Sequence, residues 1–192
     1  MGTGWQEISW QIRQHRHMIA IMLVSVWGVE YMVVGNGVNF LRIALCTGLI
    51  VIPAVLDACY MRLYHRLTLS LGVVAISSSL LWGTNSLPDI LAGAGIFGGL
   101  LLGIFLVSGS LGFGDVCYGA ALGAFLGMEQ ALLGFFLTFF LGMLWAGGIY
   151  VQAKLLSRPI KRILPLGPFM AAGSLISLIY GKELIEWYLQ GL

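Results

Sequence analysis

Two carboxylates in an otherwise apolar sequence are the residues most able to do chemistry. Asp57 ends one apolar run, and Asp115 opens another directly after the turn at Gly112 and Gly114. Ionisable side chains at membrane depth are costly to bury, so each carboxylate is a functional-site candidate. If the two meet, they cannot easily both ionise, and one keeps a proton. Such a pair could hydrolyse a peptide bond, because the ionised partner takes a proton from water and the protonated one polarises the scissile carbonyl.

Each of these residues also has a purely structural interpretation. Asp115 could cap the helix that it opens, because Asp is a favoured helix cap. Asp57 could be an interfacial charge paired with Arg62 or Arg66. A glycine turn lets another chain approach closely, since no Cβ stands in the way.

The composition is that of a membrane protein. Of 192 residues, 59% are hydrophobic and 9% are charged, and the mean hydropathy is +0.93. Soluble domains carry roughly 25% charged residues. No small-residue cleavage site follows the first apolar run, so we expect a retained helix there and not a signal peptide. Three cysteines without a CxxC pair indicate neither a zinc site nor a disulfide framework.

The apolar runs predict an all-α integral membrane protein with about seven transmembrane helices. A helix needs roughly 17 to 25 apolar residues to cross a bilayer, and the expected spans are 18–34, 38–56, 67–83, 89–108, 116–128, 131–151 and 163–180. Residues 1–17 are expected to form a cytoplasmic interfacial helix, with Trp5, Ile8 and Ile12 on one face. Residues 181–192 are expected to form an external tail. The whole chain is thus interpreted as one polytopic domain.

The placement of Lys and Arg sets the orientation through the positive-inside rule. With a cytoplasmic N-terminus, eight of the ten basic residues fall inside: Arg13, Arg16, Arg62, Arg66, Lys154, Arg158, Lys161 and Arg162. Arg42 and Lys182 fall outside. Asp57 and Asp115 then lie on the cytoplasmic side. The external loops would carry five solvated acidic residues, namely Glu30, Asp89, Glu129, Glu183 and Glu186.

Small residues recur every four positions along the later spans. Such stripes let helix backbones approach closely in lipid. The stripes are Gly95, Gly99 and Gly103; Gly119, Gly123 and Gly127; Gly134, Thr138 and Gly142; and Gly173, Ser177 and Gly181. They predict a tight bundle of the last four spans around the Asp115 turn.

Three blocks of sequence resemble the type IV prepilin peptidases, which are GxGD-type membrane aspartyl peptidases. The first is Gly112-x-Gly114-Asp115, followed by an Ala/Gly-rich helix. The second is Asp57 with the run 63–68 (LYHRLT) at the matching offset. The third is 165–173 (PLGPFMAAG), which is similar to the family's C-terminal helix start. The resemblance covers residues from about 38 to 180, and it implies a six-helix peptidase core preceded by one N-terminal helix.

The resemblance implies an activity, a location and partners. Asp57 and Asp115 would be the catalytic dyad of an endopeptidase that cleaves the leader of a prepilin or pseudopilin at the cytoplasmic face of the bacterial inner membrane. The partners would be that substrate and the lipid bilayer. The substrate would have a basic leader and an apolar helix, and the helix would lie beside spans 89–108 and 116–128. A homo-oligomer is possible, and no nucleic acid is expected. Gly112 and Gly114 would let the substrate backbone dock as an extended segment.

The sequence departs from the family pattern at three positions. Tyr64 and His65 stand where the family usually has Pro-Asn, and Cys117 stands where a Lys commonly follows the GxGD motif. Between the first two spans the chain has only residues 36–39, with no room for the domain with paired CxxC motifs found in bifunctional members. We therefore expect peptidase activity without N-methyltransferase activity, and no metal, S-adenosylmethionine or other cofactor.

Three alternatives remain open from the sequence. A small transporter or channel could also carry two buried carboxylates, although it would be expected to show inverted repeats. A peptidase-like protein that has lost activity could act as an assembly factor. An intramembrane peptidase of the presenilin type also uses GxGD, although the 165–173 block favours the prepilin group.

Overall fold

The computed structural model describes residues 4–35, 37–109, 111–156 and 164–190, and in these ranges the regular structure is entirely helical. The helices are α1 (Gly4–Gln14), α2 (Arg16–Val34), α3 (Val38–Tyr60), α4 (His65–Trp82), α5 (Leu87–Ser108), α6 (Phe113–Leu126), α7 (Met128–Leu155) and α8 (Gly167–Gln190). A helix is therefore present in the expected interfacial segment and in each of the seven expected spans, while their positions in a membrane stay predictions. Asp115 lies in the first turn of α6, because this helix begins three residues before the expected span.

Within the described ranges, four helices contain a stretch long and apolar enough to cross a membrane, namely α2, α3, α5 and α7, and α6 is a shorter apolar helix. This establishes a helical protein with several candidate spans. The number of seven crossings and the cytoplasmic N-terminus stay predictions. Among the basic residues expected inside, Arg158, Lys161 and Arg162 lie outside the described residues.

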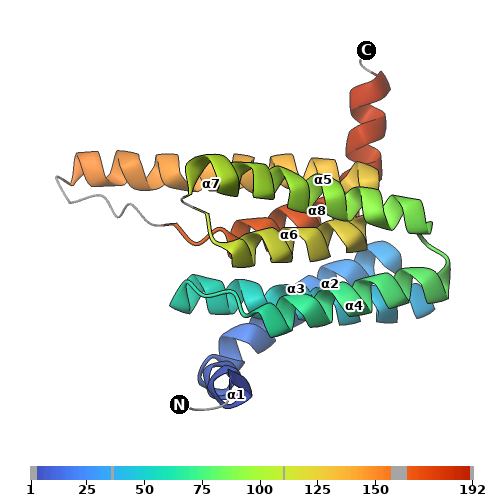
Figure 1. Cartoon of the computed structure of the whole chain (residues 1–192), viewed down its shortest axis with the longest axis horizontal. Helices are drawn as coiled ribbons and strands as arrows, with labels where there is room; N and C mark the ends of the chain where they lie inside the picture. Colours follow the sequence, from blue (N-terminus) through green and yellow to red (C-terminus); the bar gives the residue numbers. More distant parts are fainter. Residues whose placement is uncertain (1–3, 36, 110, 157–163, 191–192) are drawn as a thin grey trace.

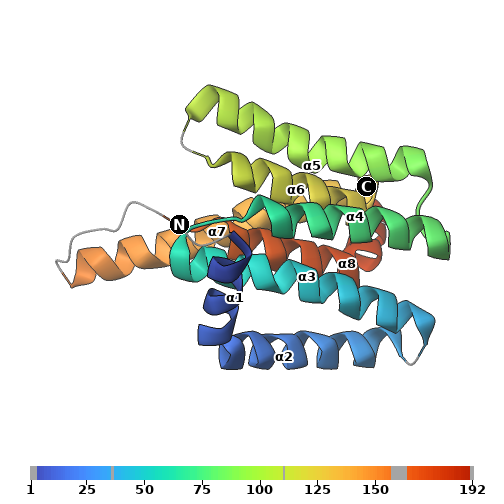
Figure 2. The ribbon, with the colours of Figure 1, turned by 60° about the horizontal axis from the view of Figure 1, so that its bottom comes forward.

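Helices α2 to α8 run roughly side by side, except that the C-terminal part of α8 turns away from the others, and α1 lies across one end of the bundle (Figures 1 and 2). Because successive helices alternate in direction, the end of α3 and the starts of α4, α6 and α8 meet at this same end. Asp57 and Asp115 are therefore at one end of the bundle, as the alternation of spans predicts.

Helix α6 is the centre of the core. It packs mainly against α5 and α4, with further contacts to α7 and α8. Its buried side chains include Tyr118, Leu122 and Phe125. The backbones of α5 and α6 approach so closely that a Cβ on Gly123 would overlap the carbonyl group of Gly93.

The prediction that the glycine stripe of α5 packs against a neighbouring helix is wrong. A Cβ on Gly95, Gly99 or Gly103 would meet nothing within 4 Å. The glycines of α5 that face α6 are Gly93 and Gly98. A helix with many glycines offers several possible stripes, and only the position of the neighbouring helix decides which one packs.

Two of the acidic residues expected in solvated loops lie elsewhere. Glu30 is 0% exposed on α2, where it accepts a hydrogen bond from the Thr47 hydroxyl (3.4 Å). Asp89 accepts a hydrogen bond from the backbone N–H of Met128 (2.9 Å) and so caps the start of α7. Helix α8 continues through residue 180 to Gln190, and whether its last turns lie outside the membrane stays a prediction.

Candidate active site

Asp57 is held by the start of α8. The residue lies in the last turn of α3 and is 6% exposed. Its Oδ2 accepts a hydrogen bond from the backbone N–H of Gly167 (2.8 Å). The first N–H groups of a helix have no partner within the helix, and the helix dipole favours a carboxylate there. A Cβ on Gly167 would lie 2.8 Å from that same oxygen, so only glycine fits.

Asp115 is held by its own turn. Its Oδ2 accepts a hydrogen bond from the backbone N–H of Gly112 (3.0 Å), and its own N–H bonds the carbonyl oxygen of Gly112 (3.0 Å). Asp115 therefore does stabilise the start of α6, as its structural interpretation predicts. Because the Gly112 N–H occupies one carboxylate oxygen and fixes the orientation of the other, this bond is compatible with a chemical role.

Asp57 does not pair with Arg62 or Arg66, as its structural interpretation would require. Arg62 pairs with Glu7 (3.5 Å), and the guanidinium carbon of Arg66 lies 5.5 Å from the ring centroid of Trp5.

Asp57 and Asp115 lie at the same end of the bundle, within the range at which their charges influence one another, although helices distant in the sequence carry them. The buried Tyr118, one turn after Asp115, links these helices, because its hydroxyl donates a hydrogen bond to the carbonyl oxygen of Ile50 on α3 (2.7 Å). Each of the two carboxylates keeps one oxygen on a glycine N–H, from Gly167 for Asp57 and from Gly112 for Asp115.

The glycine turn is packed from one side by the chain itself. A Cβ on Gly114 would lie 3.0 Å from the Cβ of Leu63 and 3.3 Å from its carbonyl oxygen. The space beside Gly114 therefore admits the α3–α4 loop (residues 61–64). Gly112 is exposed, and the approach of a substrate backbone to this turn stays a prediction.

Comparison with known proteins identifies the family. The model of the type IV leader peptidase family matches residues 43–147, which is more than half of the chain and includes both aspartates. The chain belongs to the type IV leader peptidase family. This confirms the resemblance found in the sequence.

Relatives of this leader peptidase family member align with almost all of the chain. A prepilin leader peptidase/N-methyltransferase of Bacillus subtilis is 25% identical over 90% of the chain and 68% of its own length. The protein of that name from Aeromonas hydrophila is 31% identical over 91% of the chain and 61% of its own length. The chain thus spans about two thirds of these relatives. No solved structure matches it.

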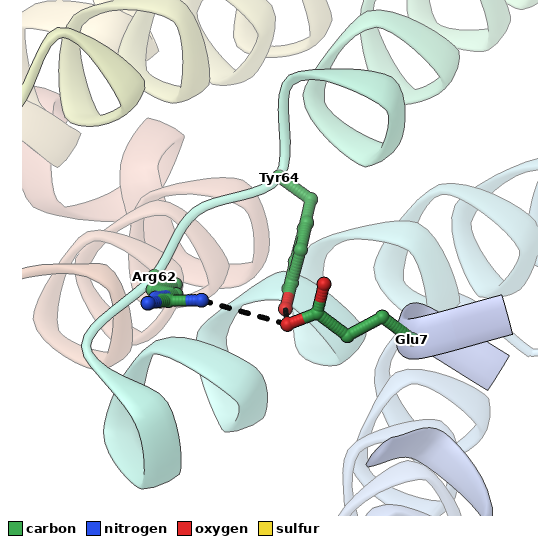
Figure 3. Close-up of polar contacts among 3 residues, drawn as sticks. All are labelled: Glu7, Arg62 and Tyr64. Carbon is green, nitrogen blue, oxygen red and sulfur yellow. Dashed lines mark hydrogen bonds and ion pairs between the residues drawn. The ribbon is translucent and has the colours of Figure 1, made fainter. Parts of the chain in front are cut away.

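The residues that depart from the family pattern each have a defined place. The hydroxyl of Tyr64 donates a hydrogen bond to Oε1 of Glu7 on α1 (3.1 Å), the same oxygen that faces Arg62 (Figure 3). Burial raises the pKa of Tyr64 above its ordinary value of 10.0, so the hydroxyl stays a donor at neutral pH. His65 is exposed at the start of α4, with its ring 6.0 Å from that of Phe113.

An apolar groove of about 570 Å³ runs between α4 and α6. The end of the groove at His65 and Phe113 lies beside Asp115 in the chain, and Cys117 is also part of its wall. Its further lining comes from Thr68, Leu69, Gly72, Val73, Ile76, Ala94, Ala120, Ala121 and Ala124. A second apolar groove of about 440 Å³ lies between α2, α3 and α8. Its lining includes Ala58 and Pro168, the chain neighbours of Asp57 and Gly167. Asp57 itself is buried against Gly167, whereas Asp115 is only half-buried.

The sequence reasoning missed two residues of this site. Gly167 was recognised only as part of a family block, and its contact with Asp57 spans 110 residues. The Gly-Pro pair at the start of a helix was the available signal, since it marks a helix N-terminus. Tyr118 was noted only within an apolar helix. Among the described residues, no group of three His, Cys, Asp or Glu side chains is placed to hold a metal ion.

Proposed function

We propose that this protein is a membrane aspartyl endopeptidase that removes the leader peptide of type IV prepilins or pseudopilins at the cytoplasmic membrane face. The observation that carries the proposal is the placement of Asp57 and Asp115 at the same end of the bundle, within range of electrostatic interaction, in a chain of the leader peptidase family. In the proposed reaction one aspartate is ionised and takes a proton from the attacking water. The other is protonated and donates its hydrogen bond to the scissile carbonyl.

The glycine contacts suit this chemistry because they preorganise the pair. Each carboxylate has one oxygen on a backbone N–H, from Gly167 for Asp57 and from Gly112 for Asp115. Orientation of this kind before substrate arrives lowers the cost of reaching the transition state. The hydrogen bond from Tyr118 on α6 to Ile50 on α3 helps to fix the relative placement of these two helices.

The groove between α4 and α6 is the proposed position of the substrate's apolar helix. Small residues such as Gly72, Ala120 and Ala124 let a second helix approach closely. The groove wall includes Phe113 and Cys117, two residues to either side of Asp115, so a helix lying in the groove would have one end beside the turn that carries this aspartate. This position lies beside α6 and α4, with α5 contributing Ala94 to the wall.

The test is cleavage of a co-expressed prepilin by wild type, Asp57→Asn and Asp115→Asn. Asn keeps the shape of the side chain and an oxygen that can accept the glycine N–H, but it removes the acid-base chemistry. We expect both variants to fold and to leave the prepilin uncut, while Glu183→Gln, an exposed change on α8, cuts normally. The wild type should show a bell-shaped pH dependence, since one carboxylate must be ionised and one protonated.

Normal cleavage by either Asn variant would make that aspartate structural and refute the mechanism. A wild type that cuts no pilin-like substrate, though folded, would instead support a binding or assembly role.

A further inference from the structure

Helix α1 contacts the part of the chain that joins the two aspartates. Ile8 is 2% exposed and packs in one cluster with Leu56, Leu67 and Tyr64. Glu7 binds the Tyr64 hydroxyl through the same oxygen that faces Arg62 (Figure 3). One face of α1 therefore covers the end of α3, the α3–α4 loop and the start of α4.

The α3–α4 loop is connected to both aspartates. It begins at Met61, whose backbone N–H bonds the carbonyl oxygen of Asp57 (2.8 Å). Two residues later, Leu63 fills the space beside Gly114, directly before Asp115. A shift of this loop would therefore move the Asp57 end of α3 relative to the Asp115 turn.

The loop needs support to keep its conformation. Met61 has a φ of 52° in the left-handed region, which is unfavourable for a residue with a side chain. At Tyr64 the backbone is extended, with φ −82° and ψ 117°. A proline there would restrict φ through its ring, whereas Tyr64 leaves φ free and instead anchors the loop through its hydroxyl.

We infer that α1 is a positioning element of the peptidase site, in which Glu7 acts through Tyr64 to hold the α3–α4 loop and so sets the separation of Asp57 and Asp115. This inference rests on the proposed function. Glu7 and Tyr64 are positioning residues, because neither touches the aspartates directly. The hydrogen bond between them is the contact that matters, since the pair of Glu7 with Arg62 is 3.5 Å long between largely exposed groups and contributes little.

The kinetic test uses the purified full chain and a prepilin substrate. Glu7→Ala and Tyr64→Phe should each lower kcat about five-fold with KM little changed, the effect of losing one hydrogen bond. The double variant should be no slower than Tyr64→Phe alone, because Tyr64→Phe already removes the contact with Glu7. Glu7→Gln should retain wild-type kcat, since its amide oxygen still accepts from Tyr64. Gln6→Ala, an exposed neighbour on α1, is the matched control.

A second measurement does not need a substrate. Backbone hydrogen exchange in detergent should become faster in residues 61–67 and 112–116 of Glu7→Ala and Tyr64→Phe, and stay unchanged in α7. Unchanged exchange and kcat in both variants would overturn the inference, as would independent, additive losses in the double variant. If the wild type cuts no prepilin, the proposed function fails, and the exchange data alone then decide whether α1 holds the loop.

Discussion

Replacing Gly167 by alanine is the sharpest test of how Asp57 is held. The added Cβ would lie 2.8 Å from Oδ2, 2.9 Å from Cβ and 3.1 Å from Cγ of Asp57. Contacts of this length to carbon are too close, so the carboxylate or the start of α8 must move. The hydrogen bond from the Gly167 N–H to Asp57, now 2.8 Å, would lengthen or break.

The size of the effect follows from that hydrogen bond. A hydrogen bond to a charged group contributes about 1.5–3 kcal/mol. If this is lost from the transition state, at 1.36 kcal/mol per factor of ten, kcat/KM falls about 10- to 150-fold. Gly142→Ala is the matched control, because its Cβ would lie 3.9 Å from the Phe169 ring, which is an ordinary contact.

The assay is prepilin cleavage followed on gels, with thermal unfolding of each purified variant in detergent. Gly167→Ala should lower both the cleavage rate and the unfolding temperature, while Gly142→Ala should change neither by much. Adding Asp57→Ala to Gly167→Ala removes the contacts to Oδ2 and Cγ but leaves the 2.9 Å contact to Cβ, so the unfolding temperature should recover only in part, and cleavage should not recover. Cleavage by Gly167→Ala within two-fold of wild type would refute the reasoning that this contact orients Asp57.

Three further predictions follow from the packing. Val73→Trp should slow cleavage by blocking the α4–α6 groove. Val24→Trp lies outside the groove and should not slow it, although Val24 (68% exposed) and Val73 (63% exposed) are similarly accessible. Equal rates in gel assays would argue against substrate docking in the groove. Gly123→Ala should lower the unfolding temperature because α5 leaves no room for a Cβ, while Gly99→Ala should keep or raise it; the opposite order in detergent melts would contradict the packing. Tyr118→Phe should lower the free energy of unfolding by about 1 kcal/mol through loss of one buried hydrogen bond; an unchanged value in denaturant titrations would show that the bond contributes nothing.

The helices could be predicted from the sequence because lipid imposes a strong rule. Every backbone polar group must be satisfied within the membrane, so long apolar runs become helices. Alternation of those helices then places Asp57 and Asp115 at one end of the bundle. The order of the spans and the placement of the two aspartates thus follow from local patterns alone.

The contacts between helices could not be predicted in the same way. Glu30 lies at the end of an apolar run and resembles a loop charge, yet it is buried against Thr47. The glycines of α5 form an apparent stripe at Gly95 and Gly99, but α6 packs on Gly93. Each outcome depends on where a second helix lies, which hydrophobic periodicity does not specify. The bond between Gly167 and Asp57 is the extreme case, because the partner is in a different third of the chain.

The length of α6 has a consequence for what such an enzyme can recognise. Its 14 residues rise only about 21 Å, while the hydrocarbon layer is about 30 Å thick. If α6 is embedded as predicted, a helix of this length cannot reach both surfaces, and where it falls short at its first turn, Asp115 lies below the level of the lipid headgroups. A peptide bond in a freely soluble chain would have to leave bulk water to reach that depth, whereas a bond attached to a membrane-inserted helix is delivered there by the bilayer itself. Vertical position in the membrane would then select the substrate before any side chain is recognised.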